Sequence, residues 1–101
     1  TTSITLEGAK FPYLYYLRMI KKKIGQNWEW PQNQGVLKTI VYFKILRTGA
    51  VEGIEIDTSS KNSLFDTAAL RAVHLAKPFS PLPGGYDEEY LGVYFEFAFK
   101  E

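Results

Sequence analysis

The spacing of hydrophobic positions changes along the chain, and its first sustained pattern is helical. Between Pro12 and Trp28 apolar residues recur every three or four positions, as on one face of a helix. Pro12 suits a first helical turn, and Pro31 disfavours helical geometry just before it, so the helix should end near residues 28–30. Its expected inner stripe is Tyr13, Leu14, Leu17, Ile20, Ile24 and Trp28.

The next two segments alternate with a period of two and predict a β-hairpin. After a connector at residues 31–35, a strand is expected from Val36 to Arg47 and a returning strand over residues 50–58. Thr48-Gly49 supplies the tight turn between them. The buried face of the first strand is expected to carry Leu37, Thr39, Val41, Phe43 and Ile45.

A second helix and a last strand complete the chain. The helix is expected to begin at Ser63, which is spaced from Asp66 like the two ends of a capping box, and to stop before Pro78. Residues 77–89 are rich in Pro and Gly and predict a loop. The strand expected from Tyr90 to Phe99 alternates most clearly, with one face made of Leu91, Val93, Phe95, Phe97 and Phe99.

These elements predict one α+β domain with two layers. Residues 1–10 show no sustained period and are expected to form a flexible N-terminal arm, which leaves residues 11–101 for the domain. The order helix, strand, strand, helix, strand predicts a three-stranded sheet with both helices on one face. The third strand could lie parallel beside the second or antiparallel beside the first. We favour the antiparallel order 2-1-3, because it places the long first strand in the middle.

This order makes the second and third strands the edges of the sheet. An exposed edge offers unpaired N–H and C=O groups to an extended peptide. The second strand carries Glu52, Glu55 and Asp57, which discourage an incoming strand, whereas residues 90–99 contain only Glu96. The sequence therefore predicts an available edge at the last strand.

Composition narrows the function. The 101 residues include 12 Lys and Arg against 11 Asp and Glu, so the net charge of +1 supplies no broad basic field for nucleic acid or an anionic membrane. The absence of Cys excludes disulfide and thiol chemistry. No run of apolar residues in the sequence is long enough to span a bilayer. One His and no Cys also make most enzyme chemistries unlikely.

Candidate chemical groups are sparse. The one histidine, His74, is expected in solvent, with no nucleophile or second ligand arranged around it. We expect Lys21-Lys22-Lys23 and Asp87-Glu88-Glu89 to be solvated, and Pro78 to Pro83 to be a stiff connector rather than a polyproline ligand. An enzyme would need a titratable cluster in a pocket. The sequence therefore predicts no catalytic residue, no cofactor and no metal site.

Several short motifs are unspecific one by one but informative in their order and spacing. Together they resemble the C-terminal domain of the TonB family, the periplasmic end of bacterial energy transducers, with the TolA C-terminal domain as a relative. The resemblance covers about residues 11–99 and is strongest in the second helix. It is carried by Tyr16-Leu17-Arg18, Asn27-Trp28, Trp30-Pro31, Tyr42-Phe43-Lys44-Ile45, Ser59-Ser60, Ala68-Ala69-Leu70-Arg71-Ala72-Val73 and Pro78-Phe79.

The resemblance implies a non-enzymatic module that adds an extended segment of an outer-membrane receptor beside its last strand. The implied partner-binding residues are Tyr90, Leu91, Gly92, Val93, Tyr94, Phe95 and Glu96. It further implies a periplasmic location, an inner-membrane anchor upstream and a proton-motor complex that powers transport.

Two alternatives stay open. The first helix, ending at Asn27-Trp28, leans toward the TolA-like side, which implies a role in envelope integrity with a Tol-Pal-type partner. The same edge could also pair with a second copy of the chain and form a homodimer.

Overall fold

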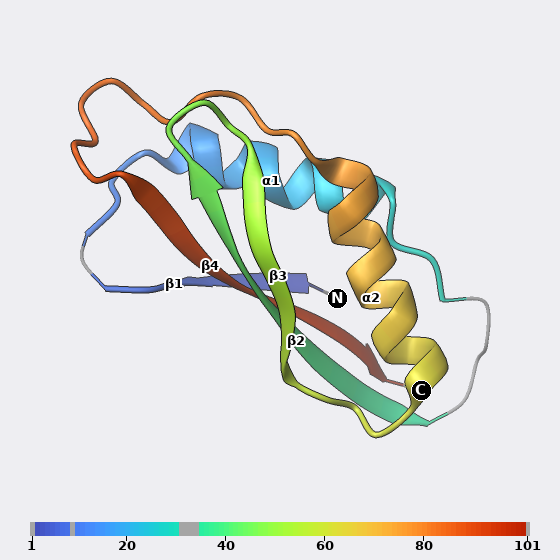
Figure 1. Cartoon of the computed structure of the whole chain (residues 1–101). Helices are drawn as coiled ribbons and strands as arrows, with labels where there is room; N and C mark the ends of the chain where they lie inside the picture. Colours follow the sequence, from blue (N-terminus) through green and yellow to red (C-terminus); the bar gives the residue numbers. More distant parts are fainter. Residues whose placement is uncertain (1, 9, 31–34, 101) are drawn as a thin grey trace.

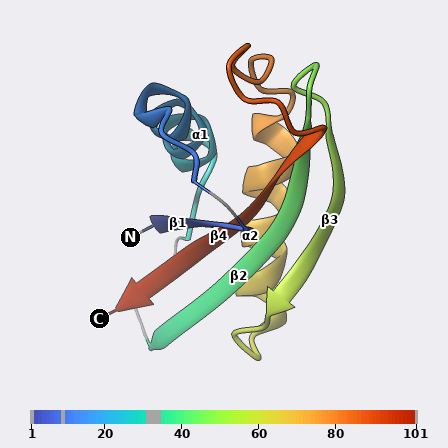
Figure 2. The same ribbon diagram turned by 90° about the vertical axis from the view of Figure 1, so that its left-hand side faces the viewer.

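The computed structural model describes residues 2–8, 10–30 and 35–100. Its elements, in chain order, are β1 (Thr2–Leu6), α1 (Leu14–Gln26), β2 (Val36–Leu46), β3 (Val51–Thr58), α2 (Ser63–Ala76) and β4 (Tyr90–Lys100), shown in Figure 1. An antiparallel sheet forms one layer and both helices cover the same face of it (Figure 2). The predicted α+β, two-layer architecture is confirmed. Of the predicted connector, residues 31–34 lie outside the described residues.

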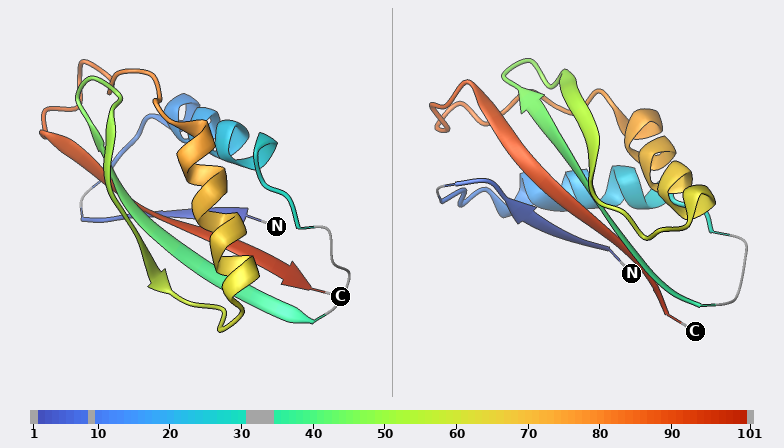
Figure 3. Two further views of the ribbon diagram at one scale, coloured as in Figure 1. Left: turned by 45° about the vertical axis from the view of Figure 1, so that its right-hand side comes forward. Right: turned by 60° about the horizontal axis from the view of Figure 1, so that its bottom comes forward.

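The sheet has four strands in the order β1-β4-β2-β3, and all neighbours are antiparallel. The predicted placement of β2 between β3 and β4 is confirmed. The prediction of three strands is wrong, because residues 2–6 of the expected arm add β1 outside β4 (Figure 3). β1 has the period of a strand, with Ile4 and Leu6 partly buried and Ser3 and Thr5 exposed. The alternation covers only five residues, near the lower end of the length at which it indicates a strand.

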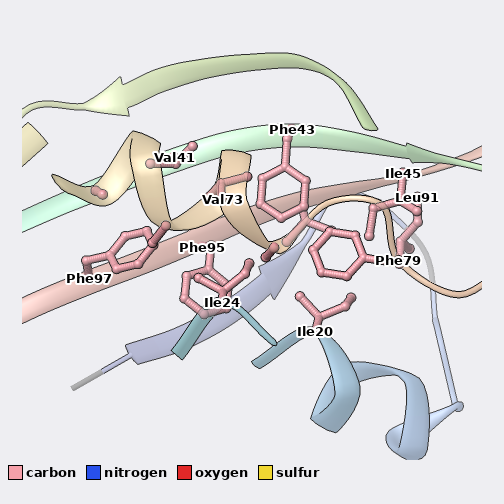
Figure 4. Packing of buried hydrophobic residues seen from close by; sticks show 14 of the residues in the cluster. Ile20, Ile24, Val41, Phe43, Ile45, Val73, Phe79, Leu91, Phe95 and Phe97 are labelled. Atoms are coloured by element: carbon pink, nitrogen blue, oxygen red, sulfur yellow. The ribbon is translucent and has the colours of Figure 1, made fainter. Parts of the chain in front are cut away.

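The core lies between the sheet and the helices. The inward residues of β2 and β4 meet Ile20 and Ile24 from α1 and the small residues of α2 (Figure 4). This is the face predicted to be buried, since successive strand residues point to opposite sides. The fully buried strand residues on it are Thr39, Val41, Phe43, Ile45, Leu91, Val93, Phe95 and Phe97.

Helix α1 buries a different stripe from the one predicted at its beginning. Leu14 is 62% exposed, whereas Tyr16 is buried. The Tyr16 hydroxyl donates a 2.6 Å hydrogen bond to the carbonyl oxygen of Ser80, and burial raises its pKa to about 12. A tyrosine can enter a core where its hydroxyl finds a partner, which the spacing of apolar residues does not reveal. Trp28, beyond the helix end, packs on Phe65 and Phe97 as expected of a core residue.

Helix α2 is capped one residue earlier than predicted. The N-cap is Asn62, whose side chain accepts hydrogen bonds from the backbone N–H groups of Leu64 and Phe65. The predicted capping box between Ser63 and Asp66 is wrong, because the Asp66 carboxylate has other partners. It accepts hydrogen bonds from Thr39 of β2 and from Ser59 and Ser60, so it ties α2 to the middle of the sheet.

The loop after α2 is fastened to the β2–β3 turn. Gly49 has a φ of +94°, and a side chain there would overlap the carbonyl group of Phe79. The Phe79 N–H donates to the Gly49 carbonyl oxygen, and Leu82 N–H donates to that of Arg47. Phe79 and Leu82 are buried, so the segment packs on its own domain, as expected for a connector. These contacts hold the start of β4 near the hairpin turn.

Candidate functional site

The seven predicted partner-binding residues lie in the first part of β4 and alternate between its two faces. Leu91, Val93 and Phe95 are buried under the helices. The other four, Tyr90, Gly92, Tyr94 and Glu96, belong to the face of the sheet that the helices leave open. Only main-chain groups and the open-face side chains are therefore placed to contact an added segment.

The outer side of β4 is occupied in this structure. β1 pairs with it from Thr2 opposite Phe97 to Leu6 opposite Val93, and the Glu7 N–H donates a 3.0 Å hydrogen bond to the Gly92 carbonyl oxygen. The prediction that β4 is a free edge is wrong, because β1 is a fourth strand of the sheet and pairs with the outer side of β4. Tyr90 and Leu91 lie beyond the end of this pairing.

β1 is held by a short ladder and a few side chains. Ile4 and Leu6 are partly buried against the core, and α1 contacts β1 from above. A five-residue outer strand with few buried side chains belongs to the part of a fold that opens most easily. β1 thus covers the predicted site with a short strand of which no side chain is fully buried.

Glu7 fastens the end of β1 on the open face. Its side chain lies over Gly92, where any added side chain at residue 92 would overlap it. The Tyr42 hydroxyl of β2 donates a 2.8 Å hydrogen bond to Glu7 Oε1. Partial burial and this hydrogen bond raise the pKa of Tyr42, so the hydroxyl stays a donor at neutral pH.

Aromatic side chains surround this contact. The rings of Tyr42 and Tyr94 lie 4.8 Å apart, as cross-strand partners in β2 and β4. Lys44 Nζ lies 4.8 Å from the centre of the Tyr90 ring, which is within cation–π range. The open face beside the predicted site therefore carries three tyrosines, one lysine and the Glu7 carboxylate.

The opposite edge has the character that the sequence predicts. Glu52, Glu55 and Asp57 are exposed along β3, and Gly53 sits at an irregularity in the pairing of β3 with β2, with a φ of +67°. Charges and bulges both discourage an added strand.

The single histidine and the acidic residues are the remaining candidates for a metal-binding arrangement. His74 is exposed, as expected. In the residues that the structure describes, no three His, Cys, Asp or Glu side chains gather closely enough to hold a metal ion. Within the same residues, no helix has the length and apolar character needed to cross a membrane.

Sequence reasoning missed β1 and Glu7 as parts of this site. The available signal is the alternation from Thr2 to Leu6, which has the polarity of a half-buried strand over five residues. Nothing in the sequence indicates that this segment lies beside β4 rather than elsewhere.

Comparison with known proteins identifies the domain. A search of curated sequences found no significant match. The computed structure is similar to the NMR solution structure of the Helicobacter pylori TonB C-terminal domain, with a TM-score of 0.67, 25% sequence identity, and coverage of 94% of this chain and 96% of that one. The sequence model of the family described as TonB C terminal matches residues 13–97. The chain therefore belongs to the TonB C-terminal domain family.

Proposed function

We propose that this domain is the periplasmic end of a TonB-like energy transducer, a binding module without catalytic activity. It holds an extended segment of an outer-membrane receptor by strand addition along residues Tyr90 to Glu96. An inner-membrane anchor lies upstream in the full protein, and a proton-motor complex in the inner membrane supplies the energy for transport. Family membership and the fold similarity support this role.

The observation that carries the proposal is the pairing of β1 with β4. It supports the proposal, because β1 is itself an extended segment on the outer side of β4, with apolar side chains directed to the core and polar ones to the open face. Because β1 already lies there, a receptor segment has to take its place. Binding in this proposal is a strand exchange rather than a simple addition.

The free energy of such an exchange is small. Main-chain hydrogen bonds of the same kind are lost and gained, each worth about 1 kcal/mol net. A receptor segment gains if it extends past β1 and also pairs beside Leu91 and Tyr90, which lie beyond the β1 ladder. This predicts a reversible grip whose strength grows with the length of the segment.

An engineered disulfide tests the exchange in the intact chain. The chain has no Cys, so Ser3→Cys with Glu96→Cys creates a single pair at directly opposed positions of β1 and β4. Opposed residues in an antiparallel ladder have Cα atoms about 4.5–5.5 Å apart, which suits a disulfide. The matched control, Ile40→Cys with Thr58→Cys, locks β2 to β3 instead.

The measurement is titration with synthetic peptides from the periplasmic N-terminal segments of TonB-dependent receptors, followed by backbone amide shifts. We expect shifts at Tyr90 to Glu96 in the reduced chain and in the control, and their loss in the oxidised β1–β4 lock. Equal binding by the locked and reduced chains would show that no exchange occurs. Shifts that map to residues 52–57, or no shifts in either state, would contradict the proposed site.

The two alternative functions make different use of the same edge. A TolA-like module would bind peptides from Tol-Pal-type partners in this assay and ignore those from receptors. A homodimer would arise if two copies exchanged their β1 strands, a form of domain swapping. Analytical ultracentrifugation of the reduced chain detects such a dimer at micromolar concentration, and the β1–β4 lock should abolish it.

A further inference from the structure

The net charge of +1 hides an uneven distribution of charge along the chain. Between Glu7 and Glu29 the sequence contains five basic residues and no acidic one, whereas the rest of the chain contains seven basic and eleven acidic residues. The five are Lys10, Arg18, Lys21, Lys22 and Lys23, and all but Lys10 belong to α1. Positive charge is therefore concentrated on one helix.

The side of α1 that faces away from the core combines this charge with exposed apolar side chains. Tyr16, Ile20 and Ile24 turn one side of the helix into the core. With about 3.6 residues per turn, the opposite side, called the outer face of α1 below, is made of Leu14, Tyr15, Arg18, Lys21 and Lys22. Leu14 is 62% and Tyr15 63% exposed, and the three basic residues are exposed as well.

The three basic side chains of the outer face have no partner within the described ranges 2–8, 10–30 and 35–100: none of them makes a hydrogen bond, an ion pair or a ring contact there. Lys23 differs, because its Nζ donates a 2.7 Å hydrogen bond to the Pro78 carbonyl oxygen and lies 5.5 Å from the centre of the Phe79 ring. A lysine is a strongly hydrated point charge on a flexible stem, so unpartnered lysines do not preform a site for a ligand of fixed shape. They suit a diffuse anionic surface.

We propose that the outer face of α1 binds the surface of a membrane that contains anionic phospholipid. Arg18, Lys21 and Lys22 meet the phosphates of the headgroups, while Leu14 and Tyr15 enter the boundary between headgroups and acyl chains. Tyrosine is enriched at that depth, because its ring is apolar and its hydroxyl polar. The inference goes beyond the proposed function, since it concerns α1 and lipid rather than β4 and a receptor segment.

The arrangement of the outer face favours a membrane over an acidic protein. Its residues follow one another along one side of a helix, and from Leu14 to Lys22 the helix rises about 12 Å. One flat surface therefore reaches all of them at once. A lipid surface offers phosphates beside an apolar layer, which matches both the basic residues and the exposed pair at the beginning of the helix. A cluster of carboxylates on a protein matches only the basic residues.

The place of α1 in the fold gives such a contact a consequence. α1 packs against β1, and both lie at the same side of the domain (Figure 2). A domain that rests on a membrane through α1 holds the edge formed by β1 and β4 near that membrane. This consequence alone rests on the proposed function: if receptor segments reach the domain at the outer membrane, the lipid contact keeps the binding edge close to them.

The first test is co-sedimentation of the intact chain with lipid vesicles. The vesicles consist of phosphatidylcholine alone, or of phosphatidylcholine with about a third of phosphatidylglycerol, in low salt and in about 0.5 M NaCl. We expect binding to the anionic vesicles only, with most of it lost in high salt because exposed charges are screened. Equal binding to both kinds of vesicle, or binding to neither, would overturn the proposal.

Two variants of equal net charge test whether α1 is the binding face. The first carries Arg18→Gln, Lys21→Gln and Lys22→Gln. The control loses one exposed arginine and two exposed lysines elsewhere, through Arg71→Gln, Lys38→Gln and Lys77→Gln. Each basic residue near an anionic surface changes the partition coefficient about fivefold, so the first variant should bind at least about tenfold more weakly than the control. Equal affinities would mean that total charge drives the binding, and would overturn the assignment to α1.

A second pair of variants tests the apolar end of the face. Leu14→Ala with Tyr15→Ala should weaken binding to the anionic vesicles about fivefold to tenfold. The control is Leu64→Ala with Leu75→Ala, which truncates two leucines of α2 that are 63% and 54% exposed, and it should bind as the original chain does. Equal binding by the two variants would contradict the insertion of Leu14 and Tyr15. Binding of poly-glutamate but not of vesicles would overturn the proposal in favour of an acidic protein.

These outcomes can be told apart from those of the receptor experiment. The vesicles contain no protein, and the β1–β4 disulfide leaves the outer face of α1 unchanged, so the oxidised chain should bind them as the reduced chain does. Binding of vesicles without binding of receptor peptides would support the lipid contact and contradict the proposed function. Binding of peptides without binding of vesicles would do the reverse.

Discussion

Strand β4 has neighbours on both sides, and the two sides differ in length and in what they bury. On the inner side it pairs with β2 in unbroken register from Leu46 opposite Tyr90 to Val36 opposite Lys100. On the outer side β1 pairs only from Val93 to Phe97, with one further hydrogen bond at Gly92. One strand thus takes part in the core on its inner side and, on its outer side, in the short pairing that we propose is exchanged.

This difference separates the two roles of β4: the side paired with β2 stabilises the domain, and the side paired with β1 is the proposed binding edge. The inward side chains of β2 from Thr39 to Ile45 are fully buried, and β2 is also tied to β3 and α2. We therefore expect that opening this side unfolds the domain. The inward side chains of β1 are only partly buried, and the strand ends in the contact of Glu7 with Tyr42. We therefore expect this domain to release β1 while its core remains intact.

The largest expected effect comes from damage to the inner side. Phe43→Ala removes a fully buried ring of β2 that stacks on Phe79, so it should lower the free energy of unfolding by about 3–5 kcal/mol. Urea denaturation measures this loss. If the loss were as small as that of a surface substitution, the pairing of β4 with β2 would not be the more stable of its two sides.

A smaller effect is expected at the tie between β2 and α2. Burial acts to raise the pKa of Asp66, but hydrogen bonds from Ser59, Thr39 and Ser60 outweigh it and lower the pKa from 3.8 to about 2. Since the folded pKa lies below the unfolded one, the carboxylate stabilises the fold above pH 3.8, and this stability is lost as the pH falls toward about 2.

Asp66→Asn should therefore destabilise the domain at neutral pH by about 1–3 kcal/mol, the cost of hydrogen bonds to a charged group. It should also flatten the dependence of the melting temperature on pH between 4 and 2. Thermal unfolding at several pH values checks both. If the melting temperature of the variant fell between pH 4 and 2 as in the original chain, carboxylates other than Asp66 would cause the fall.

The smallest effect on global stability is expected on the outer side. Ile4→Ala removes part of one partly buried side chain of β1, so it should cost about 1 kcal/mol or less in global unfolding. It should nevertheless speed hydrogen exchange at β1 and along the outer side of β4, while β2 stays protected. Ser3→Ala, on the exposed face of the same strand, serves as the control. Equal loss of protection in β1 and β2 would abolish the distinction between the two sides.

Much of the fold could be predicted from the periods of hydrophobic residues. Both helices, the hairpin and β4 follow from runs long enough to repeat their period several times. Where the prediction fails, a local signal is short or shared. Asn62 and Ser63 are both good N-caps. In the structure the Asn62 side chain accepts the capping hydrogen bonds, and Asp66 bonds to Thr39 of the sheet instead of completing a box with Ser63. Leu14 and Tyr16 both fit a helix, and the partner of the tyrosine hydroxyl decides which is buried.

The candidate site was predicted only in part. Residues 90–96 form the strand that the sequence predicts, and their alternation between a buried and an open face is confirmed. Their availability was not, because a free edge depends on every other segment that could reach it. Glu7 was missed for the same reason, because its contacts are with residues of other strands. Its side chain lies over Gly92 of β4 and accepts a hydrogen bond from Tyr42 of β2.

The sequence by itself determined which segments beyond β1 are helix and strand and which face of each is apolar. These properties depend on neighbours within a few residues, so a local pattern records them. The tertiary structure alone decided that β1 lies against β4 and that Glu7 crosses it to Tyr42. Pairing between segments about ninety residues apart depends on the edge that the folded core presents, and no local period encodes it.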